Sequence, residues 1–143
     1  MTNLDHIDKQ IISILQQEGR DSASHIAIEI GMSVPAVTDR IRKLQEANVI
    51  TGFQAIIDPR MIGLDVSALI TIISESSAHY TEVVEFAKNM EEVIQCFTTT
   101  GNGSHVLIIQ TANTRTLEIL LRQIQAWPGV MRTETQIILS NYK

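Results

Sequence analysis

The sequence predicts an α+β protein whose first part is helical and whose second part alternates strands with helices. Up to residue 50 the apolar residues recur every three or four positions, as they do in amphipathic helices. After residue 65, short β-branched runs alternate with helical patterns and glycine-containing turns. Pro59 and Gly63 separate the two patterns. We therefore divide the chain into residues 1–50, a connecting segment over 51–65 and a second domain over 66–143.

The first helix is predicted near the start of the chain, with Asp5 as its N-cap and its end at Gly19. Its apolar residues share one face: Leu4, Ile7, Ile11, Ile14 and Leu15. This face is expected to complete a core of three helices.

Two further helices, joined by a tight turn, are predicted over 22–48. Ser22 caps the first, and Gly31 ends it in the left-handed conformation. Ser33 caps the second, and Pro35 lies in its first turn, where a missing N–H costs little. The apolar residues of its buried face follow at spacings of four and three: Val37, Ile41 and Leu44.

Two short helices with a tight turn are typical of a helix-turn-helix, with or without a β wing, whose second helix enters the major groove of DNA. Arg and Lys reach guanine edges or phosphates, and Ser and Thr hydrogen-bond to either. We expect DNA contacts from residues around the two helix starts and along the second helix: Ser22, Ser24, Ser33, Pro35, Ala36, Thr38, Asp39, Arg42 and Lys43. Arg40 is expected to face Asp5 or Asp8 instead. The alternative is an ordinary helical hairpin whose charged face is solvated.

The charge balance is unusual for a DNA-binding protein. The formal net charge is -5, and residues 1–60 also carry more acidic than basic side chains. Affinity from phosphate neutralisation grows with the number of cationic contacts, so a monomer would bind DNA weakly. If DNA is the partner, we expect the chain to act as an oligomer.

The connecting segment begins with a strand-like stretch, ITGFQAII over 50–57, which Asp58–Pro59 would end. The second domain is then predicted to have the order βαββαβ. Its strands are expected over 66–74, 93–100, 105–111 and 130–139, and its helices over 81–90 and 116–126. This order is that of a ferredoxin-like split βαβ unit, with both helices on one face of an antiparallel sheet. Runs such as LITII and VLII are apolar on both sides, which favours packing of the other face between subunits.

Five segments in this order resemble a known family: LDHIDKQIISIL, GRDSASHIAIEIGMSVPAVTDRIRKLQEANVITGF, IIDPRMIGLDV, TTTGNGSHVLII and PGVMRTETQIIL. They resemble the Lrp/AsnC family, the feast/famine transcriptional regulators, over nearly the whole chain. The resemblance implies dimers built through the hinge strand and the second domains, often assembled as four dimers. It also implies amino acids or related small molecules bound between second domains.

The resemblance places the effector-binding residues in the turn after the second strand: Thr100, Gly101, Asn102, Gly103 and Ser104. We expect a further acid to complete the site, either Glu134 or Glu75. Backbone N–H groups of Gly101–Asn102–Gly103 can cradle a carboxylate, although the same sequence also suits a plain hairpin turn. Many members carry an acid where this chain has Ser104, whose hydroxyl is expected to accept from an ammonium group. At Gly103 the family often has an aromatic residue. Where the family usually has glycine this chain has Asn48, which tolerates the left-handed conformation.

Other chemistry finds little support in the sequence. No metal site is expected from the four histidines, which lie in separate elements without metal-ligand spacing: His6, His25, His79 and His105. In a strand, Ser104 and His105 would point to opposite faces, which speaks against a catalytic pair. Cys96 is expected to be a small buried hydrophobe, and a single cysteine fits a reducing compartment. With no bilayer-spanning run and no signal-peptide pattern, we expect a cytoplasmic protein.

The function favoured by these observations is a sequence-specific DNA-binding transcription regulator that responds to an amino acid or related small molecule. Its expected partners are double-stranded DNA, further copies of the chain as dimers and octamers of four dimers, and the effector, with no cofactor and no membrane. One alternative is an amino-acid-binding module that does not engage DNA, which the acidic balance supports and the basic residues of the second helix oppose. The other is a small enzyme, which the lack of a catalytic constellation opposes.

Overall fold

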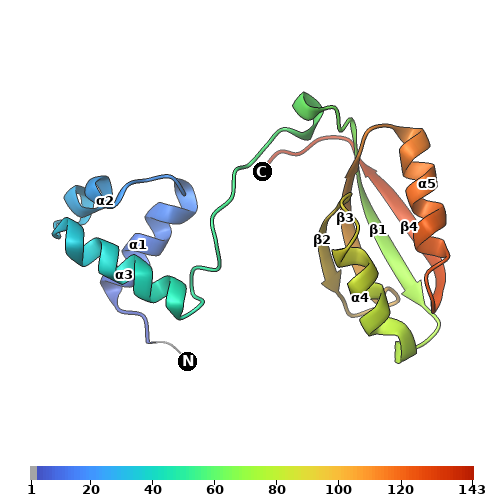
Figure 1. Ribbon diagram of the computed structural model, residues 1–143, viewed down its shortest axis with the longest axis horizontal. Helices are drawn as coiled ribbons and strands as arrows, with labels where there is room; N and C mark the ends of the chain where they lie inside the picture. Colours follow the sequence, from blue (N-terminus) through green and yellow to red (C-terminus); the bar gives the residue numbers. More distant parts are fainter. Residues whose placement is uncertain (1–2) are drawn as a thin grey trace. The chain divides into compact units, whose positions relative to one another are not determined.

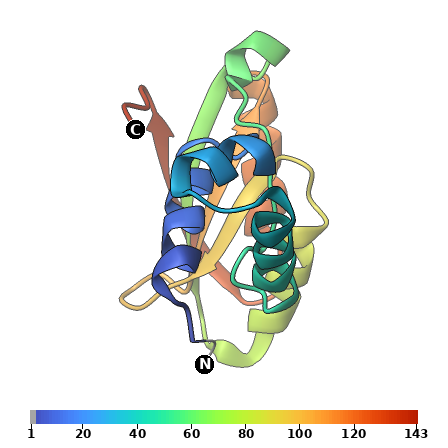
Figure 2. The same ribbon diagram turned by 90° about the vertical axis from the view of Figure 1, so that its left-hand side faces the viewer.

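The computed structural model describes residues 3–143 and forms two compact units, one up to Ile56 and one from Ile57 onward (Figure 1). The first unit holds three helices: α1 (His6–Gln17), α2 (Ala23–Ile30) and α3 (Val34–Glu46). Figure 2 shows them facing the viewer, from dark blue α1 to teal α3. One apolar stripe from each helix makes the core, with these residues buried: Ile11, Leu15, Ile26, Ala27, Val37 and Leu44. The predicted buried faces of the first and third helices are confirmed.

The predicted N-caps and the end of α2 are also confirmed, whereas α1 ends at Gln17, two residues before the predicted Gly19. The side chains of Asp5, Ser22 and Ser33 each accept a hydrogen bond from a backbone N–H of the first turn that follows. Gly31 ends α2 with a φ of 72°, a conformation that glycine adopts without steric cost. Asn48 has a φ of 55° just after α3, as expected.

The strand predicted over 50–57 is wrong for the single chain, because residues 51–58 have no regular secondary structure. A strand requires a neighbour that pairs with its N–H and C=O groups. All the strand pairing of residues 3–143 lies within the second unit, so this segment has no such neighbour. Since residues 3–56 contain no strand, the helix-turn-helix has its three-helix form here.

The second unit has the predicted βαββαβ order. Its regular elements are β1 (Val66–Ser74), α4 (Tyr80–Lys88), β2 (Val93–Thr98), β3 (His105–Thr111), α5 (Thr114–Gln125) and β4 (Val130–Ile138), with short 3-10 turns η1 (Pro59–Ile62) and η2 (Ser77–His79). The strands are all antiparallel and lie in the order β2-β3-β1-β4. The ferredoxin-like prediction is confirmed. In the described part of the chain, none of the helices is long and apolar enough to cross a membrane.

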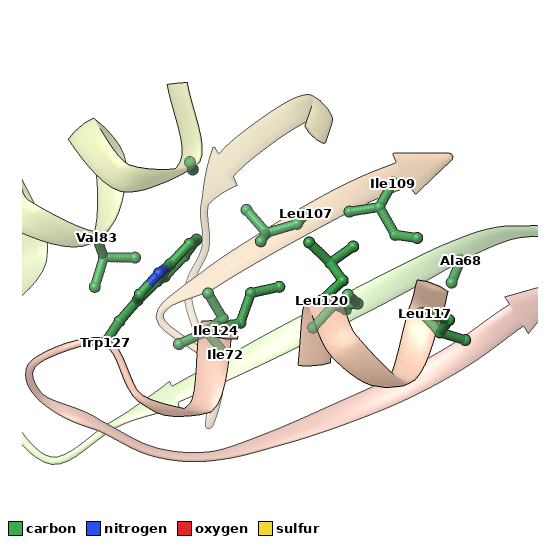
Figure 3. Close-up of a cluster of buried hydrophobic side chains, with 11 residues drawn as sticks. Ala68, Ile72, Val83, Leu107, Ile109, Leu117, Leu120, Ile124 and Trp127 are labelled. Atoms are coloured by element: carbon green, nitrogen blue, oxygen red, sulfur yellow. The ribbon is translucent and has the colours of Figure 1, made fainter. Parts of the chain in front are cut away.

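The core of the second unit fills the space between the sheet and its two helices (Figure 3). Every second residue of the strands and every third or fourth residue of the helices faces this core. The buried residues are Ala68, Ile70, Ile72, Leu107 and Ile109 from the sheet, and Val83, Ala87, Leu117, Leu120 and Ile124 from the helices. Trp127 closes the cluster after α5. Phe86 on α4 is partly exposed, and its ring stacks on Trp127 with centroids 5.6 Å apart.

The opposite face of the sheet is the second apolar face that the sequence predicted. Strand alternation and pairing place these side chains on it: Leu69, Thr71 and Ile73 from β1, Val106 and Ile108 from β3, and Phe97 from β2. We call it the open sheet face.

Candidate DNA-binding surface and effector loop

The exposed side of α3 carries most of the predicted DNA contacts. Ser33, Pro35, Thr38, Arg42 and Lys43 are exposed, whereas Ala36 and Asp39 are half-buried. Val37 is fully buried on the other side of the helix. In the preceding helix, Ser22 and Ser24 are exposed as well. The hydroxyls of Ser22 and Ser33 already accept their capping bonds, and each keeps its proton for a further acceptor such as a phosphate oxygen.

The basic residues of this surface are paired with acids on the same helix. Arg42 donates to Asp39 and to Glu46, both at 2.6 Å, and Lys43 Nζ lies 2.9 Å from Asp39. The hydrogen bonds from Lys43 and Arg42 lower the pKa of Asp39 below its usual value. Exposed pairs of this kind contribute only about 0–1 kcal/mol, so a phosphate can replace the carboxylates at small cost.

Arg40 lies apart from this surface, as predicted. Its guanidinium donates to Asp5 at 2.7 Å and to Asp8 at 2.9 Å. These bonds join α3 to the start of α1 and raise the pKa of Arg40. Arg40 therefore has a structural role in the three-helix unit.

Among residues 3–143, the structure brings together one group of possible metal ligands that the sequence analysis did not anticipate. The ligand atoms of Asp21, His25 and Glu29 lie within 4.8 Å of one another. Their spacing of four residues was the signal available in the sequence. His25 Nδ1 lies 2.7 Å from Asp21, and this hydrogen bond raises the pKa of His25. We assign the group as a surface ion pair beside a third, exposed carboxylate.

The predicted effector loop, residues 100–104, connects β2 to β3. Gly101 has a φ of 91°, in the left-handed region. Gly103 lies against β1 so closely that a Cβ there would collide with Thr71 Cγ2. Thr99 closes the loop with two bonds, from its N–H to the Ser104 carbonyl at 2.9 Å and from its hydroxyl to the Gly103 carbonyl at 3.2 Å. Thr100, Gly101 and Asn102 are exposed at the tip.

Ser104 does not have the free hydroxyl that we expected. It is 6% exposed, and its Oγ lies 2.6 Å from Ser74 Oγ, 2.7 Å from His105 Nδ1 and 3.3 Å from the Ile72 carbonyl. Ser104 and His105 also do not point to opposite faces, because Ser104 precedes the first residue of β3 and is outside the regular pleat. All the hydrogen-bond contacts of this hydroxyl lie inside the protein, and its part in binding a ligand stays a prediction.

Glu134 lies on the open sheet face of β4 and remains accessible. It is the register partner of Thr71, the residue that Gly103 touches from the other side. Its carboxylate accepts from Arg132 at 2.6 Å. The structure thus brings Gly103 and Glu134 to two sides of one threonine, and it adds Arg132, which the sequence analysis missed.

Cys96 is half-buried and packs against the core of the second unit. Burial raises the pKa of its thiol, so it is not an activated nucleophile.

Two family descriptions match the chain, one for each unit. The description "Winged helix-turn-helix DNA-binding" matches residues 4–51, and "Lrp/AsnC ligand binding domain" matches residues 66–143.

Named relatives extend over nearly the full length of the chain. An HTH-type transcriptional regulator FL11 from Pyrococcus horikoshii is 37% identical, over 98% of this chain and 92% of the relative. The regulatory protein AsnC from Haemophilus influenzae is 32% identical, over 99% of this chain and 95% of the relative. Among solved structures, a feast or famine regulatory protein from M. tuberculosis complexed with L-methionine superimposes with a TM-score of 0.92 at 33% identity, covering 99% and 95% of the two chains. The structure of E. coli AsnC gives a TM-score of 0.85 at 28% identity, covering 98% and 95%.

The ligand-binding description matches more than half of the chain, and the named relatives match nearly all of it. Both findings agree with the order of elements and with the exposed basic side of α3. The chain belongs to the Lrp/AsnC family of transcriptional regulators, with a helix-turn-helix DNA-binding unit followed by the family's ligand-binding domain.

Proposed function

We propose that this regulator binds its operator as a dimer or larger assembly through α2 and α3, and that an amino acid bound at the loop 100–104 changes its affinity for DNA. The proposal of DNA binding rests on the position of Arg42 and Lys43 on α3. Both are exposed, and they lie on the side of the helix away from buried Val37 and Leu44. A helix with this arrangement can place its basic side chains against phosphates and base edges without disturbing its core.

Self-association is supported by two surfaces that lack partners in the single chain. The sequence of segment 51–58 is typical of a strand, and the segment exposes Phe53, Ile56 and Ile57, with Ile56 97% exposed. The open sheet face is apolar along β1 and β3. We propose that a second copy of the chain pairs with this segment and packs on this face, and that four such dimers assemble. Each dimer doubles the number of cations that contact phosphates, and affinity for DNA grows with the number of such contacts.

For the effector, we propose that the backbone N–H groups of Gly101–Asn102–Gly103 bind the carboxylate of an amino acid and that Glu134 binds its ammonium group. An exposed loop with glycine at two positions lets a ligand approach the backbone closely. Glu134 is the register partner of Thr71, the residue that Gly103 lies against, and Arg132 donates a hydrogen bond to its carboxylate. That a relative of known structure is complexed with L-methionine supports an amino acid as the ligand class.

The alternative, an amino-acid-binding module that does not engage DNA, is favoured by the ion pairs that occupy Arg42 and Lys43. We consider the regulator the better account because those pairs are exposed and weak. We also propose that the protein is not an enzyme, since the Ser104–His105 contact is buried where no substrate can reach it. A regulator of transcription works where the DNA is, and the cytoplasm remains the expected compartment.

The test is a selection of genomic DNA fragments with the purified protein, with and without each of the twenty amino acids. The proposal predicts enrichment of specific fragments and a change in their retention with at least one amino acid. Uniform retention of all fragments would contradict sequence-specific binding. Enrichment that no amino acid alters would contradict the effector proposal alone.

A further inference from the structure

Three polar side chains form a buried cluster at the base of the effector loop: Ser74 at the end of β1, Ser104 at the end of the loop and His105 at the start of β3. We call it the serine–histidine cluster. Ser104 Oγ is its centre, at 2.6 Å from Ser74 Oγ and 2.7 Å from His105 Nδ1. Ser104 is 6% exposed and His105 is fully buried. The DNA-binding surface uses none of these groups, and the effector contacts proposed above do not either.

The hydrogen-bonding capacity of each atom points to one arrangement of protons in the cluster. The Ile72 carbonyl has no proton, so in its 3.3 Å contact with Ser104 the hydroxyl is the donor. With that proton given to Ile72, Ser74 and His105 both donate to Ser104 Oγ, which has two lone pairs to receive them. In this arrangement His105 carries its proton on Nδ1. Its Nε2 has no hydrogen-bond partner among the described residues, and in this tautomer it is a bare acceptor and not an orphaned N–H donor.

The opposite tautomer is disfavoured because it would leave a buried donor without a hydrogen-bond partner. With the proton on Nε2, a buried N–H donor would have no acceptor, which is rare in folded proteins. The ring also contacts the aromatic ring of Tyr80 edge-on, with centroids 4.9 Å apart, so His105 cannot rotate freely to find another partner. The Nδ1–H donor is thus directed at Ser104.

The cluster determines where the second half of the loop lies. The backbone N–H of Ser104 donates to the Ile72 carbonyl at 2.8 Å, and the preceding residue is Gly103, which touches Thr71. Ser104 is therefore bonded to β1 by both its backbone and its side chain. The exposed tip, Thr100 to Asn102, has no side-chain hydrogen bond to the rest of the described chain. The position of the tip depends on the anchored end.

We propose that His105 is a positioning residue for effector binding, which acts through Ser104 to hold the Gly101–Gly103 backbone in the conformation that receives the ligand. This proposal rests on the proposed function, in which that backbone binds an amino acid. His105 does not touch the ligand. It supplies the donor that fixes the hydroxyl of Ser104 toward Ile72.

The test compares variants of the full-length protein. His105→Leu removes the donor with little change in volume. His105→Asn keeps an N–H donor near the position of Nδ1 and serves as the conservative rescue. Thr111→Val is the matched control, because Thr111 is buried at the other end of β3 and its hydroxyl makes a similar 2.6 Å bond to Thr116. All three variants lose some stability, so stability alone does not distinguish them.

Two readouts separate positioning from simple packing. Calorimetric titration with the twenty amino acids should show an affinity about tenfold lower in His105→Leu, near wild type in His105→Asn and unchanged in Thr111→Val, since a lost buried hydrogen bond is worth about that factor. Amide hydrogen exchange of residues 100–104 in the free protein should accelerate in His105→Leu and not in Thr111→Val. Long-range nitrogen NMR of the His105 ring should find the proton on Nδ1.

A ring proton on Nε2, or equal loss of affinity and of loop protection in His105→Leu and Thr111→Val, would overturn the proposal. If the wild type binds none of the amino acids, the proposed effector fails. The exchange and NMR measurements on the free protein then still decide whether His105 fixes the loop.

Discussion

Arg42 and Asp39 lie one turn apart on the exposed side of α3, with Arg42 Nη2 2.6 Å from Asp39 Oδ1. The same carboxylate is also bonded to Lys43. One acid thus pairs with both basic residues that we expect to meet DNA. It also repels phosphates directly, since like charges at close range oppose association.

Asp39→Asn should therefore raise the affinity for non-specific duplex DNA, by about fivefold at most because exposed ion pairs are weak. Fluorescence anisotropy with a random-sequence duplex measures this. The matched control is Glu118→Gln, which removes an exposed pair with Arg122 on α5 of the second unit. Weaker binding by Asp39→Asn would instead show that the carboxylate itself accepts from a base, as acids can from cytosine.

Val37→Asp should unfold the first unit. Val37 is fully buried, and an unpaired carboxylate there costs several kcal/mol, comparable to the whole stability of a small domain at about 5 kcal/mol. Ile28→Asp is the matched control, because Ile28 is 82% exposed on α2 of the same unit. NMR spectra of the full chain should lose the dispersed signals of residues 3–50 in the first variant only. Retained dispersion in Val37→Asp would contradict the buried face of α3.

Features encoded within a few residues could be predicted from the sequence. Asp5, Ser22, Gly31 and Ser33 define helix boundaries because a cap depends only on the backbone of its own turn. The pairing of Arg40 with Asp5 was also predictable, since it follows from which faces two adjacent helices turn toward each other.

Features that depend on distant segments could not be predicted. The strand over 50–57 lacks a neighbour in the single chain, and a strand pattern does not reveal whether its partner exists. Ser104 has a polar side chain in a loop, which suggested a free hydroxyl. Its position beside Ser74, 30 residues earlier in the chain, decides otherwise. Nothing local to Ser104 carries that information.

Gly103→Ala should displace the effector loop and weaken amino-acid binding, because the new Cβ collides with Thr71 Cγ2. Adding Thr71→Ser removes Cγ2 and should restore binding. Gly19→Ala is the control, because a Cβ there would meet only ordinary contacts at 3.7 Å and Gly19 lies in neither the effector loop nor the segment 51–58. Calorimetric titration measures all of them, with DNA binding measured in parallel and expected to stay constant. Failure of the double variant to recover would show that the collision is not the cause.

The second unit should lose stability in acid because burial lowers the pKa of His105 below its ordinary value of 6.5. The unfolded chain then binds more protons than the folded one. The free energy of unfolding is therefore at its full value above pH 6.5 and falls as the pH drops below it. His25 has the opposite sign, since Asp21 raises its pKa and the pair adds stability to the first unit that is lost as the pH rises.

Histidines titrate between about pH 8 and pH 5. Amide hydrogen exchange measured over this range reports the stability of each unit separately. His105→Asn should abolish the decline in the second unit and leave the first unit unchanged. A decline of the same size in the variant would assign the effect to another group.

The central claim, that α3 binds DNA through Arg42 and Lys43, is tested most directly by the salt dependence of DNA affinity. Wild type, Arg42→Ala, Lys43→Ala and the control Arg122→Ala are titrated with one duplex over a range of salt concentrations. Both α3 variants should bind more weakly than wild type and remain folded. Each should also flatten the slope of log affinity against log salt by about one, and Arg122→Ala should not change it. Identical affinities and slopes in all four proteins would remove α3 from the DNA interface and contradict the account.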